Sequence, residues 1–213
     1  MKNKSKKRDI IRTILMVLAL FMVFGVGLYM WGRLHRKSDE PTNVAKVTDE
    51  IKKFNYSLND NVTAYYKTEF DKLKDMVDNG EITESDLASQ IAKLYVIDLY
   101  SMSYKINKYE VTSAQYYYSS KQDMFKNKVI DNFYNLMEDN SYEDRKQELV
   151  EVSNVDITNT KQGTYKLDDK EVTSDIVDVN ITYVKDLGYE NKLEITLVHD
   201  GEANISVVAS KAI

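Results

Sequence analysis

The stretch LYVIDLYSM places one carboxylate among apolar residues. Asp98 lies four residues after Leu94 and four before Met102, so on a helix it lies on or beside the apolar face. A buried carboxylate can have a raised pKa and act as a general base. The alternative is a boundary aspartate that accepts a hydrogen bond from a tyrosine hydroxyl or a backbone amide. We favour this second interpretation, because no second catalytic group can be placed near Asp98.

Three consecutive tyrosines, Tyr116, Tyr117 and Tyr118, are the next feature. If residues 114–118 are extended, Tyr116 and Tyr118 share one face and Tyr117 points to the other. A tyrosine combines an apolar ring with a polar hydroxyl, so this run suits the edge of a core, the wall of a groove or an interface. We predict that the tyrosines seal the core and that one of them faces a partner. With Asp98 they are the candidate groove or partner contacts.

Metal and nucleophilic chemistry find little support in the residue types. The chain has no cysteine, which excludes disulfides and thiolate sites. Asp75–Asp86 partly matches an EF-hand calcium loop, but Val77 cannot be a ligand and a turn between two helices explains the same letters. His35 and His199 have no partner histidine nearby, so we expect neither zinc nor histidine acid–base chemistry. We expect no cofactor and no enzymatic activity.

An apolar stretch near the N-terminus predicts a membrane anchor. Thr13–Trp31 contains no charged residue and spans about 28 Å as a helix, close to the thickness of a bilayer core. Six basic residues precede it and three follow, which favours a cytoplasmic N-terminus. A cleaved signal peptide is the alternative, but no small-x-small cleavage site follows. We therefore predict a basic tail over 1–12, a membrane helix over 13–31, a linker over 32–43 and an extracytoplasmic domain over 44–213.

Charge is distributed unevenly along the chain. Residues 1–37 carry a net charge of +8 and the whole chain carries −5, so residues 38–213 carry −13. Because phosphate contacts need a basic surface, the acidic body argues against nucleic-acid binding. We expect the partners to be the lipid bilayer, through Thr13–Trp31, and envelope proteins or further copies of this chain, at the plasma membrane.

Apolar residues at helical spacing predict three helices after the linker. Asp60 or Asn61 can cap the first helix, and Gly80 occupies the usual glycine position after it. Thr83 can cap the second helix in a capping-box arrangement. The predicted helices span about 61–78, 84–106 and 120–138, the last with Phe125, Val129, Phe133, Leu136 and Met137 facing a core.

An alternating pattern predicts strands after Asn140. Asp200–Gly201 favours a tight hairpin turn, and the segment around Gly188 favours a second turn. Residues 44–58 have no clean period and predict either a short strand around Phe54 to Leu58 or a helical stalk. The predicted C-terminal strands span about 149–159, 164–172, 175–186, 191–199 and 202–210. The segment TYKLDDKEV, 164–172, can alternatively form an extended hairpin.

These elements predict an α+β fold in which about three helices pack on a curved C-terminal antiparallel sheet. With the basic tail, membrane helix and linker, this layout resembles the nuclear transport factor 2-like (cystatin-like roll) superfamily. More narrowly, it resembles the bitopic inner-membrane scaffold proteins of type IV secretion and conjugation machines. The segments FNYSLNDN, LYVIDLYSM and NSYEDRKQELVEVSNV are also similar in style to single-pass membrane proteins of low-G+C Gram-positive bacteria. The resemblance carries over no functional residue.

We therefore predict a membrane-anchored, non-enzymatic scaffold or protein-interaction domain, as in a conjugation or secretion complex. One alternative is a ligand-binding or sensory ectodomain with a pocket between helices and sheet near Tyr116, Tyr118 and Asp98. Another is an isomerase-like enzyme that uses Asp98. An open, polar-lined cavity that reaches Asp98 would favour the alternatives, whereas a filled core would leave a role for the surface.

Overall fold

The computed structural model describes residues 43–80, 82–199 and 204–213, and the structural statements below concern these residues. The predicted basic tail, the predicted membrane helix Thr13–Trp31 and the predicted turn at Asp200–Gly201 lie outside them. Among the described residues, no helix combines the length and the apolar character needed to cross a bilayer.

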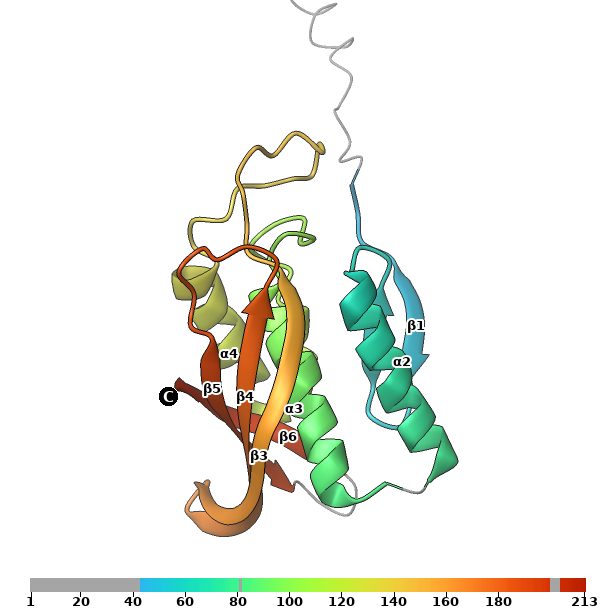
Figure 1. Ribbon diagram of the computed structural model, residues 1–213, viewed down its shortest axis with the longest axis vertical. Helices are drawn as coiled ribbons and strands as arrows, with labels where there is room; N and C mark the ends of the chain where they lie inside the picture. The colour runs from blue at the N-terminus through green and yellow to red at the C-terminus, as the bar shows by residue number, and fades with distance from the viewer. Residues whose placement is uncertain (1–42, 81, 200–203) are drawn as a thin grey trace, which may run out of the picture. The chain divides into compact units, whose positions relative to one another are not determined.

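The described residues form an α+β fold with three α-helices and two antiparallel sheets (Figure 1). The larger sheet has the strand order β3-β4-β5-β6, and the smaller sheet pairs β1 with β2. The α+β prediction, with helices preceding a C-terminal antiparallel sheet, is thus confirmed. The elements are β1 (Val47–Ile51), β2 (Tyr56–Asn59), α2 (Ala64–Asn79), α3 (Glu84–Tyr100), α4 (Gln122–Lys128), β3 (Val152–Leu167), β4 (Lys170–Tyr183), β5 (Lys192–His199) and β6 (Ile205–Ala212).

The predicted strand 149–159 and the first part of the predicted segment 164–172 belong to one long strand, β3, and the hairpin alternative for 164–172 is correct. β3 pairs with β4 along its whole length, so the predicted strand 164–172 contains the hairpin turn itself. Asp168 and Asp169 form this turn with φ of 45° and 67°, the left-handed conformation that a two-residue hairpin requires. Gly163 lies inside β3, where a Cβ atom would come 3.2 Å from a neighbouring isoleucine side chain. This glycine permits close packing rather than a turn.

The second predicted helix ends six residues early, at Tyr100 rather than at 106. Beyond it, the backbone N–H groups of Met102 and Ser103 donate to Val150 O at 2.8 and 3.1 Å. The Ser101 hydroxyl accepts the N–H of Val152 at 3.0 Å. The chain therefore leaves the helix to bond with the start of β3, and helical bonding stops.

The third predicted helix is also shorter than expected. α4 ends at Lys128 and is followed by one π-type turn, Val129–Phe133, instead of continuing to 138. The next residue, Tyr134, turns inward and is fully buried. Leu136, predicted to face the core, is 80 % exposed because the helix has already ended.

The helix ends near the N-terminus match the predictions only in part. Thr83 caps α3 by accepting the N–H of Asp86 at 3.1 Å, and Gly80 follows α2 with φ of 69°, both as predicted. Thr63, not Asp60 or Asn61, caps α2. The Asp60 carboxylate instead accepts the backbone N–H of Lys46, the residue just before β1.

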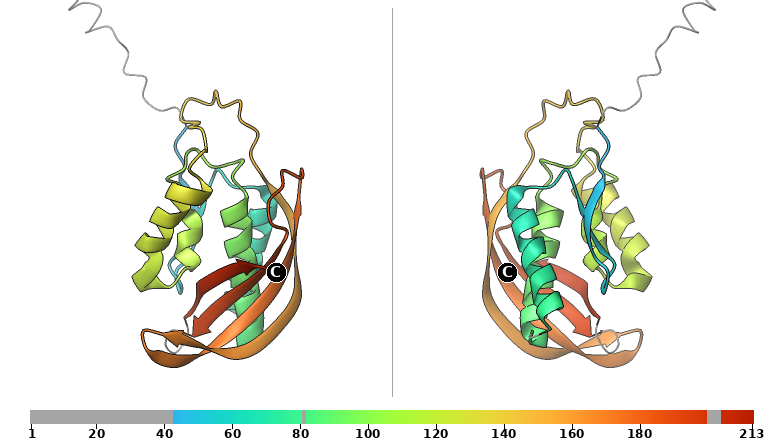
Figure 2. Two further views of the ribbon diagram at one scale, coloured as in Figure 1. Left: turned by 90° about the vertical axis from the view of Figure 1, so that its left-hand side faces the viewer. Right: turned by 90° about the vertical axis from the view of Figure 1, so that its right-hand side faces the viewer.

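The residues before α2 form two short strands, so a helical stalk over 44–58 is wrong and the strand prediction is confirmed in outline. α3 is the central helix: it contacts α2 and all four strands of the larger sheet. Figure 2 shows the β3–β4 ribbon bending past one end of α3. The register of β3 against β4 is also irregular near Val152 and Ile157, as expected for bulged strands.

Replacing Gly80 with alanine tests the left-handed end of α2. A Cβ atom here would meet nothing within 4 Å, so the cost is backbone strain alone. We expect Gly80→Ala to lower the free energy of unfolding by about 1 kcal/mol, measured by urea unfolding of the purified protein. Gly80→Asn is the control and should lose less, because asparagine tolerates this conformation. Equal losses for both variants would contradict the explanation.

Candidate functional site

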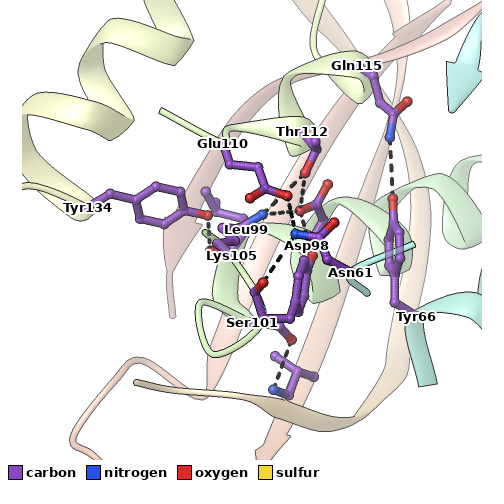
Figure 3. A network of polar contacts seen from close by, with 12 residues as sticks. Asn61, Tyr66, Asp98, Leu99, Ser101, Lys105, Glu110, Thr112, Gln115 and Tyr134 are labelled. Carbon is purple, nitrogen blue, oxygen red and sulfur yellow. Dashed lines mark hydrogen bonds and ion pairs between the residues drawn. The ribbon is translucent and has the colours of Figure 1, made fainter. Parts of the chain in front are cut away.

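Asp98 and Lys105 form a buried ion pair where α3 ends (Figure 3). Both side chains are 0 % exposed, and Lys105 Nζ lies 2.5 Å from Asp98 Oδ1. Tyr104 and Thr112 donate their hydroxyls to the same carboxylate oxygen at 2.9 and 2.7 Å. Removing two charges from water is costly, so these additional hydrogen bonds are needed to hold the pair.

Aromatic rings surround the buried ammonium group. Lys105 Nζ lies 4.8 Å from the ring centroid of Tyr104 and 5.8 Å from that of Tyr134. Both rings present a π-face that attracts a cation, an effect that is larger away from water. The Tyr134 hydroxyl donates to Leu99 O at 2.7 Å, which fixes this ring against the end of α3.

A second set of polar contacts closes the loop over 101–111 around the ion pair. The Asn61 amide donates to Glu110 at 2.8 Å, and the other Glu110 oxygen accepts the N–H of Ile106 at 2.8 Å. The Arg145 guanidinium donates to the carbonyls of Ser103 and Lys105 at 2.7 and 2.8 Å. The loop is therefore held from two distant parts of the chain.

This arrangement suits structural support better than catalysis. A general base must come within hydrogen-bond reach of a substrate. The Asp98 side chain is fully buried, and it is not among the lining residues of four prominent surface hollows of the described residues. The interpretation of Asp98 as a hydrogen-bonded boundary aspartate is correct for the tyrosine contact, but the sequence did not reveal Lys105 as its partner.

Tyr116 lies in the core, and the extended segment assumed for 114–118 is wrong at this residue. Thr112–Tyr116 forms a 3₁₀ helix, and the chain becomes extended only at Tyr117. The hydroxyls of Tyr116 and Tyr66 lie 2.6 Å apart, and both side chains are buried. Burial raises the pKa of both tyrosines well above its usual value, because the phenolate would lose its hydration.

Tyr117 and Tyr118 join this segment to the edge of the larger sheet. Tyr117 forms a parallel bridge with Val207, and the Tyr118 N–H donates to Val207 O at 2.9 Å. The Tyr117 hydroxyl donates to Val208 O at 2.6 Å. Its ring stacks on Phe125 with centroids 4.4 Å apart and planes 10° apart. Tyr118 packs on the second, smaller apolar cluster, which includes Val208.

A hollow of about 350 Å³ lies between α4 and β6, and Tyr117 lines it. We call it the aromatic groove. Met124 is 60 % exposed at its rim, and Lys128 is its charged lining residue. Of the four candidate contacts, Asp98 and Tyr116 are interior, and Tyr117 reaches this open surface. The groove is lined chiefly by Tyr100, Tyr117, Met124, Phe125, Phe133 and Val208.

A histidine–aspartate pair was missed by the sequence analysis. His199 Nε2 lies 2.7 Å from Asp175 Oδ2, and Glu84 lies 3.6 Å from the other ring nitrogen. Asp175 is buried, so an interior carboxylate holds one nitrogen of the His199 ring. The alternating pattern contained the signal, because Asp175 is in phase with the buried Val177 and His199 with the buried Leu197. Among the described residues, no group of three metal-ligating side chains accompanies the pair.

Comparison of the chain with protein-family models, with curated proteins and with solved structures finds no match.

A double-mutant cycle tests the buried ion pair. We expect Asp98→Asn or Lys105→Met alone to lower the free energy of unfolding by about 3–5 kcal/mol, because each leaves an unpaired buried charge. The double variant should lose much less than the sum of the two losses. Urea unfolding of all four proteins measures the coupling. Additive losses would mean that the two side chains do not compensate each other.

Alkaline pH should destabilise the fold through its buried tyrosines. The pKa of Tyr66, Tyr104, Tyr116 and Tyr134 is raised in the folded protein, chiefly by burial. Above a pH of about 10 the unfolded chain therefore binds fewer protons than the folded protein. Each such tyrosine then lowers the free energy of unfolding by about 1.4 kcal/mol per pH unit, whereas below that pH it contributes no pH dependence.

Urea unfolding between pH 8 and 11.5, roughly the range that brackets tyrosine ionisation, measures this fall. The double variant Tyr66→Phe, Tyr116→Phe is the control. The fall of its free energy of unfolding with pH should be less steep than that of the unchanged protein by about 2.7 kcal/mol per pH unit, because two ionising groups are gone. An unchanged slope would show that these hydroxyls do not govern the alkaline transition.

Proposed function

We propose that the chain is a single-pass membrane protein whose C-terminal domain lies outside the cytoplasm and binds another protein. Thr13–Trp31 is the proposed anchor, with the basic N-terminus in the cytoplasm at the plasma membrane. The domain acts as a non-enzymatic scaffold in an envelope complex, in the manner of conjugation or secretion machines. The observation that carries the protein-binding proposal is the aromatic groove.

The composition of the groove supports a protein partner. Tyrosine, phenylalanine and methionine are the residue types enriched at protein interfaces. Tyr100 and Phe133 are half-buried with their ring centroids 5.1 Å apart, and Met124 projects beside them. Rigid rings stacked on the core lose little conformational entropy on binding, so a partner can gain affinity there. The exposed methionine can adapt to the shape of the partner.

The buried polar network supports a non-enzymatic role. Asp98, the one residue for which the sequence suggested a catalytic alternative, is enclosed by Lys105, Tyr104 and Thr112. The antiparallel sheet with helices packed on it is compatible with the resemblance to the roll-like ectodomains of bitopic secretion scaffolds. That resemblance, with the predicted anchor, is our reason for proposing an envelope complex.

A small-ligand role is the second candidate, and one hollow favours it. A space of about 390 Å³ beside Tyr117 is lined by the amides Asn55, Gln115 and Gln122. Its size suits a small polar molecule. Gln115 is already engaged, since its amide accepts the N–H of Ser57 at 2.7 Å, so fewer groups are free for a ligand. This is why we place the protein-binding role first.

Site-specific photocrosslinking tests the proposal. A photoreactive residue in place of Met124, in the full-length protein in its native cells, should give a defined adduct with one envelope protein. The control is the same residue at Leu136, which is also apolar and 80 % exposed but does not line the groove. We expect no matching adduct there.

Two results would contradict the proposal. Identical adducts at both positions, or none at Met124, would mean that the groove is not a protein-binding surface. Release of the protein from membranes by an alkaline carbonate wash would contradict the anchor, independently of the groove.

A further inference from the structure

β6 is an edge strand, and only part of its outer edge is covered in the described structure. β5 occupies one side of β6. On the other side, Tyr117 and Tyr118 pair with Val207, and the chain then turns away at Ser119 into a short 3₁₀ helix. Among the described residues, no strand lies beside the remaining edge over 209–212.

The backbone groups at this open edge can be assigned from the pairing with β5. The N–H of Ile213 donates to Lys192 O on β5. Backbone groups of successive residues in a strand point to opposite sides, so Lys211 also faces β5. Ser210 and Ala212 therefore direct their N–H and C=O groups away from the sheet. Such unpaired groups are a template for an added strand.

We propose that an extended segment of another protein adds to β6 along Ser210–Ala212 and places one large apolar side chain in the aromatic groove. The inference rests on the proposed function and specifies how the partner binds. A segment of this chain already binds to the same edge of β6 in this way, because Tyr117 and Tyr118 pair with Val207, which precedes Ser210 on the strand. Main-chain hydrogen bonds would provide affinity, and the groove would select the side chain.

The occupant is another protein rather than a second copy of this chain. Ser210 faces the groove side of the sheet, where its hydroxyl lies 3.3 Å from the Tyr95 hydroxyl. If two copies paired antiparallel through β6, each would bring its own Ser210 and Ala212 to that side. These side chains are too small to fill a space of about 350 Å³ lined by aromatic rings.

Charge further defines the partner segment. Lys128 lines the groove and Lys126 is also exposed, and in the part of the chain that the structure describes neither has an ion-pair partner. The rest of the body is acidic, with −13 over residues 38–213 against −5 for the whole chain. The segment therefore carries a carboxylate close to its large apolar side chain, since complementary charge favours specific association.

Proline substitution separates strand addition from other binding modes. Ser210→Pro removes an N–H that points away from β5, so the sheet keeps its own hydrogen bonds. Ser210→Ala is the matched control, because it also loses the contact with Tyr95 but keeps the N–H. Both substitutions are made in the full-length protein that carries the photoreactive residue at Met124. We expect Ser210→Ala to keep the yield of the adduct and Ser210→Pro to reduce this yield at least about tenfold.

Lys128→Glu provides a second test that does not alter the strand. Lys128 is exposed, so this charge reversal should leave the fold intact. We expect it to weaken the adduct by about tenfold at low salt. Mass spectrometry of the crosslinked partner peptide should find a large apolar residue with an acidic residue beside it.

The outcomes distinguish this inference from the proposed function. An adduct that persists in a folded Ser210→Pro protein would overturn strand addition and leave a protein-binding groove. An adduct between two copies of this chain would overturn the choice of occupant. The absence of any adduct at Met124 in the otherwise unchanged protein would overturn both. Thermal unfolding of Ser210→Pro beside Ser210→Ala establishes that the two variants are equally folded.

Discussion

The ion pair between Asp98 and Lys105 is the interaction on which the rest of the domain depends. Its two charges are fully buried, so each needs the other and the hydroxyl and aromatic groups around them. α3 ends at Tyr100, and the chain folds back within a few residues, which brings the Lys105 ammonium to Asp98. The end of α3 therefore coincides with this polar contact and with the backbone bonds that Met102 and Ser103 make to Val150.

The same carboxylate positions the surface that we propose binds a partner. Thr112 donates to Asp98 and begins the 3₁₀ helix that buries Tyr116. The next residue is Tyr117, which stacks on Phe125 and donates a hydrogen bond to the edge strand β6. A short covalent path therefore connects the buried pair to the aromatic groove. The network provides a rigid base for the groove, which is the proposed binding surface.

Much of the fold followed from local signals, and the failures have a common cause. Alternation and helical periodicity gave the class and order of elements, and the cap at Thr83 is a local hydrogen bond that a motif can reveal. The end of the second helix, the burial of Lys105 and the pairing of His199 with Asp175 depend on residues distant in sequence or on chain reversal. Such contacts leave little trace in periodicity.

Amide hydrogen exchange in a Lys105→Met variant tests the central role of the ion pair most directly. If the pair holds the segment from Ser101 to Tyr118 as one unit, the amide of Tyr118, bonded to Val207 O, should exchange faster together with those of Met102 and Ser103. Amides in the middle of β4, such as that of Val177, should stay more protected than these, since they exchange only when the whole domain unfolds. Unchanged protection of the Tyr118 amide, with faster exchange confined to residues next to Lys105, would contradict the account.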